Sequence, residues 1–122
     1  MRRVIVIDDN NDLRELMCLI LRQAGFEVEG ASDGQEGLAA QRARPAEVVI
    51  TDIFMPNQDG IETISMFRKE FPGIKLIVMS GDSKLVHDSA YFMTARELGV
   101  NGVLPKPFDE DELLKVIGEV LR

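Results

Sequence analysis

The chain is poor in cysteine, histidine and positive charge, and each shortage excludes a class of function. Its single cysteine, Cys18, cannot form an internal disulfide, which fits a reducing compartment. Its single histidine, His87, cannot form a histidine metal cluster. Lysine and arginine total 14 against 21 for aspartate and glutamate, and the net charge of -7 argues against direct binding to nucleic acid or to an anionic membrane.

Long hydrophobic runs are missing as well. No apolar stretch approaches the roughly 20 residues that span a bilayer. The amino-terminal run Val4–Ile7 passes directly into Asp8 and Asp9, which is unlike a signal peptide, so we expect a cytoplasmic protein. With 45% hydrophobic and 29% charged residues, the composition predicts one globular domain over residues 1–122.

Short apolar runs rich in valine and isoleucine alternate with segments of helical periodicity. A strand is expected near residues 26–31, and four further runs lie at Val4–Ile7, Val48–Ile50, Leu76–Met79 and Val103–Leu104. Such runs are typical of parallel strands whose two faces are both covered by helices. The sequence therefore predicts an α/β fold built on a five-stranded parallel sheet.

Helices are expected between these runs, and several of them carry a recognisable start. One helix is expected near residues 11–24, and Gly25 is suited to end it. Asp33, Asp59 and Asp109 are each followed three residues later by glutamate, a spacing typical of capping boxes. We therefore interpret these three aspartates as structural residues.

Reactive polar residues lie where the apolar runs end: Asp8, Asp9, Thr51, Asp52, Ser80 and Lys106. Ligands of parallel sheets bind beyond the carboxyl ends of the strands, so these side chains are expected to meet in one crevice. Gathered carboxylates repel one another unless a cation intervenes, and Mg²⁺ prefers oxygen ligands of this kind together with phosphate oxygens. Lys106 adds a charge suited to a phosphoryl anion. The residues thus indicate phosphoryl chemistry.

The order and spacing of five motifs resemble the receiver domain of two-component response regulators, over essentially the whole chain. The motifs are Val4-Ile5-Val6-Ile7-Asp8-Asp9, Thr51-Asp52-Ile53-Phe54-Met55-Pro56, Asp59-Gly60, Val78-Met79-Ser80-Gly81 and Lys106-Pro107-Phe108. The resemblance, closest to chemotaxis regulators, implies a doubly wound sheet of strand order 2-1-3-4-5 in a flavodoxin-like three-layer sandwich. It also implies a bacterial phosphoprotein that takes part in phosphorelay signal transduction.

The resemblance assigns roles residue by residue. Asp52 would accept a phosphoryl group from the phosphohistidine of a sensor histidine kinase or phosphotransfer protein, and would become an aspartyl phosphate. Asp9, Asp52 and the backbone carbonyl of Phe54 would bind Mg²⁺ directly, whereas Asp8 would act mainly through water. Lys106 would balance charge on the phosphoryl group.

The resemblance further implies a switch with self-catalysed phosphorylation and dephosphorylation, and not an enzyme. The Ser80 hydroxyl would turn toward the phosphoryl group, and the bond between Lys106 and Pro107 would be cis. The surface of the fourth helix, fifth strand and fifth helix would respond. A downstream protein, an output domain of the same chain, or a second receiver in a phosphorylation-linked homodimer would bind there.

The sequence departs from the family pattern on that same side. Val103 takes a position that is commonly aromatic, and the interval from Ser80 to Lys106 is about four residues longer than is common. In the family, the aromatic residue at this position is coupled to the hydroxyl sensor, which here is Ser80. We hypothesise that the longer loop and one of Tyr91 or Phe92 replace this coupling. Phe54 and Asp82 are expected to tune the lifetime of the phosphoryl group.

Two alternatives remain open at this stage. The chain could be a metal-dependent phosphatase, but such enzymes place a second aspartate two residues after the nucleophile, where this chain has Phe54. It could also be a receiver-like interaction module that works without phosphorylation. The joint presence of Asp8, Asp9, Asp52 and the other predicted site residues argues against that alternative.

Overall fold

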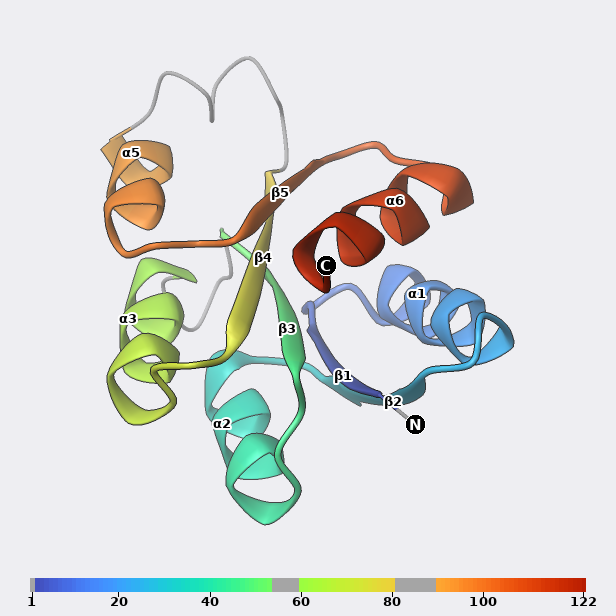
Figure 1. Ribbon diagram of the computed structural model, residues 1–122, viewed down its shortest axis with the longest axis horizontal. Helices are drawn as coiled ribbons and strands as arrows, with labels where there is room; N and C mark the ends of the chain where they lie inside the picture. The colour runs from blue at the N-terminus through green and yellow to red at the C-terminus, as the bar shows by residue number, and fades with distance from the viewer. Residues whose placement is uncertain (1, 54–59, 81–89) are drawn as a thin grey trace.

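Strands and helices alternate along the chain in the computed structural model, which describes residues 2–53, 60–80 and 90–122 but not the side chains of Ser80, Ala90, Tyr91 and Phe92 (Figure 1). The five strands are β1 (Arg3–Ile7), β2 (Glu27–Ala31), β3 (Val48–Asp52), β4 (Lys75–Ser80) and β5 (Gly102–Pro105). The helices within the described residues are α1 (Asn11–Gln23), α2 (Gly34–Ala43), α3 (Gly60–Glu70), α5 (Ala90–Glu97) and α6 (Glu110–Val120).

All strand pairs are parallel, and the strands follow the order β2-β1-β3-β4-β5. This confirms the doubly wound topology that the family resemblance implied. Ile7 at the end of β1 pairs in register with Thr51 of β3, so the residues that follow these two positions lie side by side. β2 is added on one side of β1, and β3, β4 and β5 follow on the other side, so the strand order reverses between β1 and β3. Ligands of such folds bind at this point, beyond the carboxyl ends of the strands.

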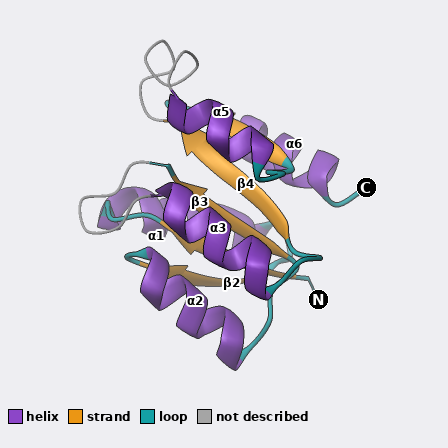
Figure 2. Ribbon diagram, turned by 90° about the vertical axis from the view of Figure 1, so that its left-hand side faces the viewer, coloured by secondary structure: helices purple, strands orange, loops and turns teal. Residues whose placement is uncertain are grey.

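Helices cover both faces of the sheet, as Figures 1 and 2 show. Helices α1 and α6 lie on one face, over an apolar cluster that includes Val6, Met17 and Ile117. Helices α2, α3 and α5 lie on the other face, over a cluster that includes Ile7 and Phe67. Every residue of β1 and β3 is buried. Close packing against the apolar clusters on both faces of the sheet therefore fixes the positions of the ends of these strands.

The helix starts agree only in part with the expected capping boxes. Asp109 forms the complete box with Glu112 at the start of α6. At α2, Asp33 accepts a hydrogen bond from the Glu36 amide at 2.8 Å, but the Glu36 carboxylate accepts from the Ser32 hydroxyl. The nearby hydroxyl thus replaces the expected return bond to the Asp33 backbone. Asp59 lies outside the described residues.

The junction between β3 and α3 depends on a glycine. The Gly60 amide donates to the Ile53 carbonyl at 3.1 Å, and a Cβ atom at Gly60 would lie 2.3 Å from the same oxygen. Only glycine allows this approach, which brings the start of α3 against the residue that follows Asp52.

No helix within the described ranges has both the length and the apolar character needed to cross a bilayer.

Candidate functional site

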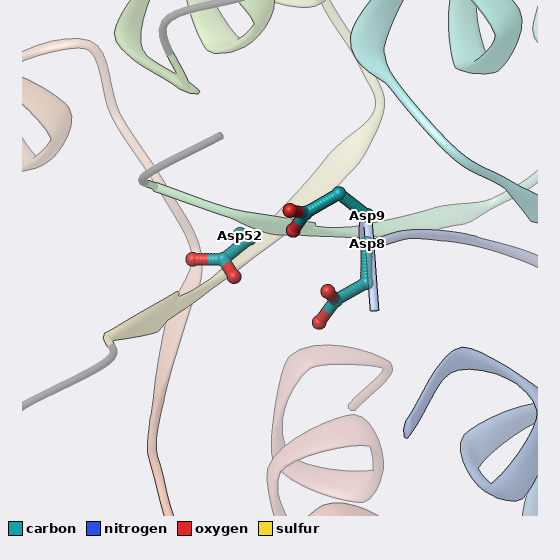
Figure 3. Close-up of side chains that lie close together, drawn as sticks. All are labelled: Asp8, Asp9 and Asp52. Atoms are coloured by element: carbon teal, nitrogen blue, oxygen red, sulfur yellow. The ribbon is translucent and has the colours of Figure 1, made fainter. Parts of the chain in front are cut away.

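Three aspartates from the ends of β1 and β3 form an acidic cluster. One carboxylate oxygen from each of Asp8, Asp9 and Asp52 lies within 4.8 Å of the others, as Figure 3 shows for the three side chains. Asp8 is fully buried and Asp52 is 6% exposed, whereas Asp9 is exposed to solvent. β1 and β3 are adjacent and pair in register, so their carboxyl ends lie side by side at the same edge of the sheet. This pairing brings the three aspartates together.

Lys106 supplies a positive charge to the cluster from the segment after β5. Its Nζ atom lies 2.7 Å from Asp52 Oδ2 and 3.1 Å from Asp8 Oδ2. Burial acts to lower the pKa of Lys106, but the hydrogen bonds and charges of Asp52 and Asp8 outweigh it and raise the pKa above the ordinary lysine value. The lysine is therefore a fixed cation at neutral pH. The Lys106-Pro107 bond is cis, as expected.

Backbone contacts orient Asp8 within the cluster. Its amide donates to the Ala31 carbonyl of β2 at 3.1 Å, and its Oδ1 atom accepts from the Asn10 amide at 2.9 Å. One carboxylate oxygen of Asp8 thus faces the following loop, and the other faces Lys106. Asn10 also caps α1 by accepting from the Leu13 amide. The hydrogen bonds that the Asp8 and Asn10 side chains accept from nearby backbone amides therefore stabilise the conformation of the loop between β1 and α1.

The donor set of the cluster fits Mg²⁺. Three carboxylates and one ammonium leave the group with an excess of negative charge, and all the side-chain donors of the cluster are hard oxygens. Mg²⁺ is commonly bound by one or two carboxylates, while water or phosphate completes its ligands. The acidic pocket can therefore hold this ion.

The structure brings together four of the residues predicted from the sequence: Asp8, Asp9, Asp52 and Lys106. Ser80 ends β4 in register with Pro105 of β5, so its backbone lies at the same edge of the sheet. The Ser80 side chain is outside the described residues.

Other sequence-based expectations lie in undescribed parts of the chain. Phe54, Asp82 and His87 are among these residues, as are the side chains of Tyr91 and Phe92. Val103, at the commonly aromatic position, is half-buried and packs against the apolar cluster under α2, α3 and α5.

Arg14 is a contact of the site that sequence reasoning missed. Its guanidinium donates to the Asp8 carbonyl at 2.7 Å and to Asn11 Oδ1 at 2.7 Å. An arginine in the second turn of an amphipathic helix has no pattern that distinguishes this contact from solvent exposure. The only available signal for the contact was that Arg14 lies six residues after Asp8 in the sequence.

An apolar depression lies beside the acidic cluster. Its volume is about 360 Å³, and it is lined by Leu13, Lys106, Pro107 and Phe108. Further along α1, the large apolar side chains of Leu16 and Leu19 are about half exposed. The rim of the site thus includes apolar surface from α1 and from the segment before α6.

The fold and this strand-end site define a receiver domain, and the chain belongs to the response regulator receiver domain family, whose model matches residues 4–118. It is 34% identical, over its whole length, to the transcriptional regulatory protein CpxR homolog of Haemophilus influenzae and covers 51% of that protein. It is 33% identical over 95% of its length to the CAI-1 autoinducer sensor kinase/phosphatase CqsS of Vibrio cholerae and covers 17% of that protein. The chain thus spans about half or less of these curated relatives.

Solved structures agree with this assignment. A CheY-like response regulator receiver domain protein from Methanospirillum hungatei has a TM-score of 0.90 at 28% identity, with 99% of this chain and 94% of that chain covered. The chemotaxis response regulator CheY4 of Vibrio cholerae has a TM-score of 0.87 at 29% identity, with 98% of both chains covered. The expected family and flavodoxin-like fold are therefore confirmed.

Proposed function

We propose that residues 1–122 act as a phosphoacceptor switch in which Asp52 receives a phosphoryl group from the phosphohistidine of a sensor histidine kinase or a phosphotransfer protein. One observation carries this proposal: the Asp52 carboxylate lies in a group of three aspartates and is held 2.7 Å from the Lys106 ammonium. Phosphoryl transfer requires mainly positioning and charge balance, which such a group can supply.

The proposed transfer is a substitution at phosphorus. An Asp52 carboxylate oxygen forms a bond to the phosphorus atom as the phosphorus–nitrogen bond of the phosphohistidine breaks. The bonding electrons stay on the imidazole nitrogen, which takes up a proton from water. Lys106, whose pKa is raised by Asp52 and Asp8 against the opposing effect of burial, remains protonated and balances the charge on the transferred group.

Asp8, Asp9, Asp52 and the backbone carbonyl of Phe54 are the proposed ligands for Mg²⁺. A bound Mg²⁺ would supply positive charge to the phosphoryl oxygens. Both oxygens of the Asp8 carboxylate are engaged, one by the Asn10 amide and the other by the Lys106 ammonium. We therefore assign it the role of holding the site together, chiefly through water-mediated contact with the ion.

The proposed consequence is a change of binding surface and not turnover of an external substrate. Ser80 would contact the phosphoryl group, and the surface formed by α5, β5 and α6 would pass the signal to a downstream protein, to an output domain of the same chain or to a second receiver. The kinase would bind near α1 and the segment before α6, where the apolar depression lies. Direct binding of nucleic acid or membrane by this domain is not part of the proposal, and its cytoplasmic location stays a prediction.

The test is the intact mass of the protein after incubation with a small acyl phosphate and MgCl₂. We expect the added mass of one phosphoryl group on wild type, loss of that mass on Asp52→Asn, and loss when a chelator removes Mg²⁺. Asp111→Asn is the matched control, because Asp111 is an exposed aspartate in the first turn of α6 and should leave phosphorylation unchanged.

A phosphorylated histidine kinase, used as a second phosphoryl donor, distinguishes the proposed function from its alternatives. If neither the acyl phosphate nor a phosphorylated histidine kinase adds a phosphoryl group to wild type, the proposal is wrong and the phosphorylation-independent interaction module becomes the better account. Sustained hydrolysis of external phosphoesters, with an acyl-phosphate intermediate on Asp52, would instead favour the phosphatase.

A further inference from the structure

Arg14 contacts the peptide group that joins two members of the acidic cluster. The Asp8 carbonyl belongs to the peptide bond between Asp8 and Asp9, and the Arg14 guanidinium donates to this oxygen at 2.7 Å. The same guanidinium donates to Asn11 Oδ1 at 2.7 Å, in the first turn of α1. Arg14 thus links the peptide plane between the two aspartates to the start of the helix.

The arginine side chain is itself held in place by β2. A Cβ atom built on Gly30 would lie 3.2 Å from Arg14 Cδ and 3.3 Å from Arg14 Cγ, so the aliphatic stem lies close against the glycine. Gly30 pairs in register with Val6 of β1, two residues before Asp8. The absence of a side chain at Gly30 leaves the space through which Arg14 reaches the Asp8 carbonyl.

Asp9 depends on this peptide more than Asp8 does. The Asp8 carboxylate is oriented by the Asn10 amide and by Lys106, and it is fully buried. Asp9 is exposed, so packing does little to fix its side chain. Its direction therefore follows the orientation of the peptide between Asp8 and Asp9.

We propose that Arg14 is a positioning residue for the divalent cation site, because it fixes the Asp8–Asp9 peptide so that both carboxylates face the same ion. The inference rests on the proposed function insofar as it assumes that the acidic cluster binds Mg²⁺. Residues that orient metal ligands through hydrogen bonds commonly change metal affinity about 10- to 100-fold when they are replaced.

Charge and positioning predict opposite results when Arg14 is replaced by glutamine. Removal of a positive charge near an acidic site strengthens the attraction of Mg²⁺, so an arginine that acted only through its charge would weaken binding in the wild type. Loss of the hydrogen bond to the Asp8 carbonyl instead frees the peptide and weakens binding in the variant. The direction of the change therefore distinguishes the two roles.

The experiment measures Mg²⁺ binding to the full chain by isothermal titration calorimetry. We expect Arg14→Gln to weaken Mg²⁺ binding about tenfold, and Arg14→Lys, which can still donate one hydrogen bond, to lose less. Arg22→Gln is the matched control, because Arg22 is also on α1, carries the same charge and donates to a backbone carbonyl, that of Val28 at 3.0 Å. It should bind Mg²⁺ as wild type does.

Gly30→Val provides an independent variant in which no charge changes. The added side chain displaces the Arg14 stem, while valine favours the strand conformation of β2. We expect weaker Mg²⁺ binding than in wild type without a loss of stability toward urea in the absence of Mg²⁺. A purely structural role for Arg14 predicts that affinity and stability fall together.

The outcomes separate this inference from the proposed function. If wild type binds Mg²⁺ and is phosphorylated on Asp52, but Arg14→Gln binds the ion equally well or more tightly, the positioning role is wrong and the proposed function stands. If wild type binds no Mg²⁺, the proposed function and the inference both fail.

Discussion

At the residue scale, Lys106 balances two buried or nearly buried carboxylates. Lys106→Met removes the ammonium that lies 2.7 Å from Asp52 and 3.1 Å from Asp8. The remaining carboxylates then repel one another without compensation, and we expect the free energy of unfolding in the absence of Mg²⁺ to fall by about 1–3 kcal/mol. Urea denaturation measures this change, and Lys115→Met, at an exposed position on α6, is the control.

The same variant should respond more strongly to Mg²⁺ and less strongly to alkaline pH than the wild type does. Without the lysine the site is more negative, so the ion should bind more tightly and restore part of the lost stability. The raised pKa of Lys106 means that its contribution to stability is complete below the ordinary value of 10.5 and is lost as the pH rises through the raised value. An equal loss of stability in Lys106→Met at pH 8 and well above that range would contradict this account.

The chemistry-bearing residues of the site were predictable one by one, but their supports were not. Asp8, Asp9, Asp52 and Lys106 follow strand-like apolar runs, and parallel strands bring such ends together. Arg14 acts on a backbone carbonyl, and any helix residue of suitable length can do so. Local sequence does not encode which carbonyl lies within reach, so this contact required the three-dimensional arrangement.

At the element scale, Arg68 joins α3 to the segment before β4 and to the turn between α5 and β5. Its guanidinium donates to the carbonyls of Pro72, Ile74 and Gly99 and to Asn101 Oδ1, at 2.8 to 3.1 Å. Because three of these acceptors are backbone oxygens, Arg68→Met should leave several polar groups without a protein partner. Three of the four contacts are exposed, so water can replace the guanidinium there, and we expect the free energy of unfolding to fall by about 1–2 kcal/mol.

Arg42 provides the comparison for Arg68. It forms a bidentate ion pair with Glu70, at 2.6 and 2.7 Å, and both side chains are exposed. Exposed pairs of this kind are screened by water, so Arg42→Met should have no measurable effect on urea denaturation. Equal effects of the two substitutions would show that the contacts of Arg68 do not stabilise the fold.

A second prediction at this scale concerns the capping box at the start of α6. Asp109 accepts from the Glu112 amide at 2.8 Å and its own amide donates to the Glu112 carboxylate at 3.1 Å. Asp109→Ala removes the bond that the carboxylate accepts, while the backbone amide of residue 109 can still donate to Glu112, and the loss should cost about 1 kcal/mol in thermal or chemical unfolding. Asp111→Ala, in the same first turn but outside the box, should cost clearly less.

Local patterns predicted the elements better than their detailed contacts. The spacing of Asp109 and Glu112 was sufficient to predict the complete capping box, because both partners lie within one turn. The same spacing at Asp33 and Glu36 gave only half of a box, since Ser32 offered a competing donor. A motif therefore indicates which bonds can form, and neighbouring side chains decide which ones do.

At the scale of the whole molecule, strand order was not available from periodicity. The apolar runs predicted five parallel strands, but the order β2-β1-β3-β4-β5 came from the family resemblance and was then confirmed by the structure. Strand neighbours far apart in sequence leave no local pattern, whereas the spacing of motifs around the site is specific to one family. The functional residues thus predicted the topology more effectively than the apolar core did.

The acidic cluster also couples ion binding to the stability of the whole chain. The net charge is -7, and three carboxylates converge on one point between the ends of β1 and β3. A ligand that binds only the folded state stabilises it, and at a Mg²⁺ concentration about tenfold above the dissociation constant the gain is about 1.4 kcal/mol. We therefore expect the melting temperature to rise with MgCl₂, whereas NaCl of equal ionic strength should give a smaller change, since screening alone does not fill the site.

Asp52→Asn tests whether this stabilisation arises at the proposed site. The substitution removes one of three gathered negative charges, so the protein without Mg²⁺ should be as stable as wild type or more stable. Its melting temperature should respond only weakly to Mg²⁺, because one ligand of the cluster is lost. A Mg²⁺-dependent rise as large as that of wild type would mean that the ion stabilises the chain elsewhere, among the other exposed acidic residues.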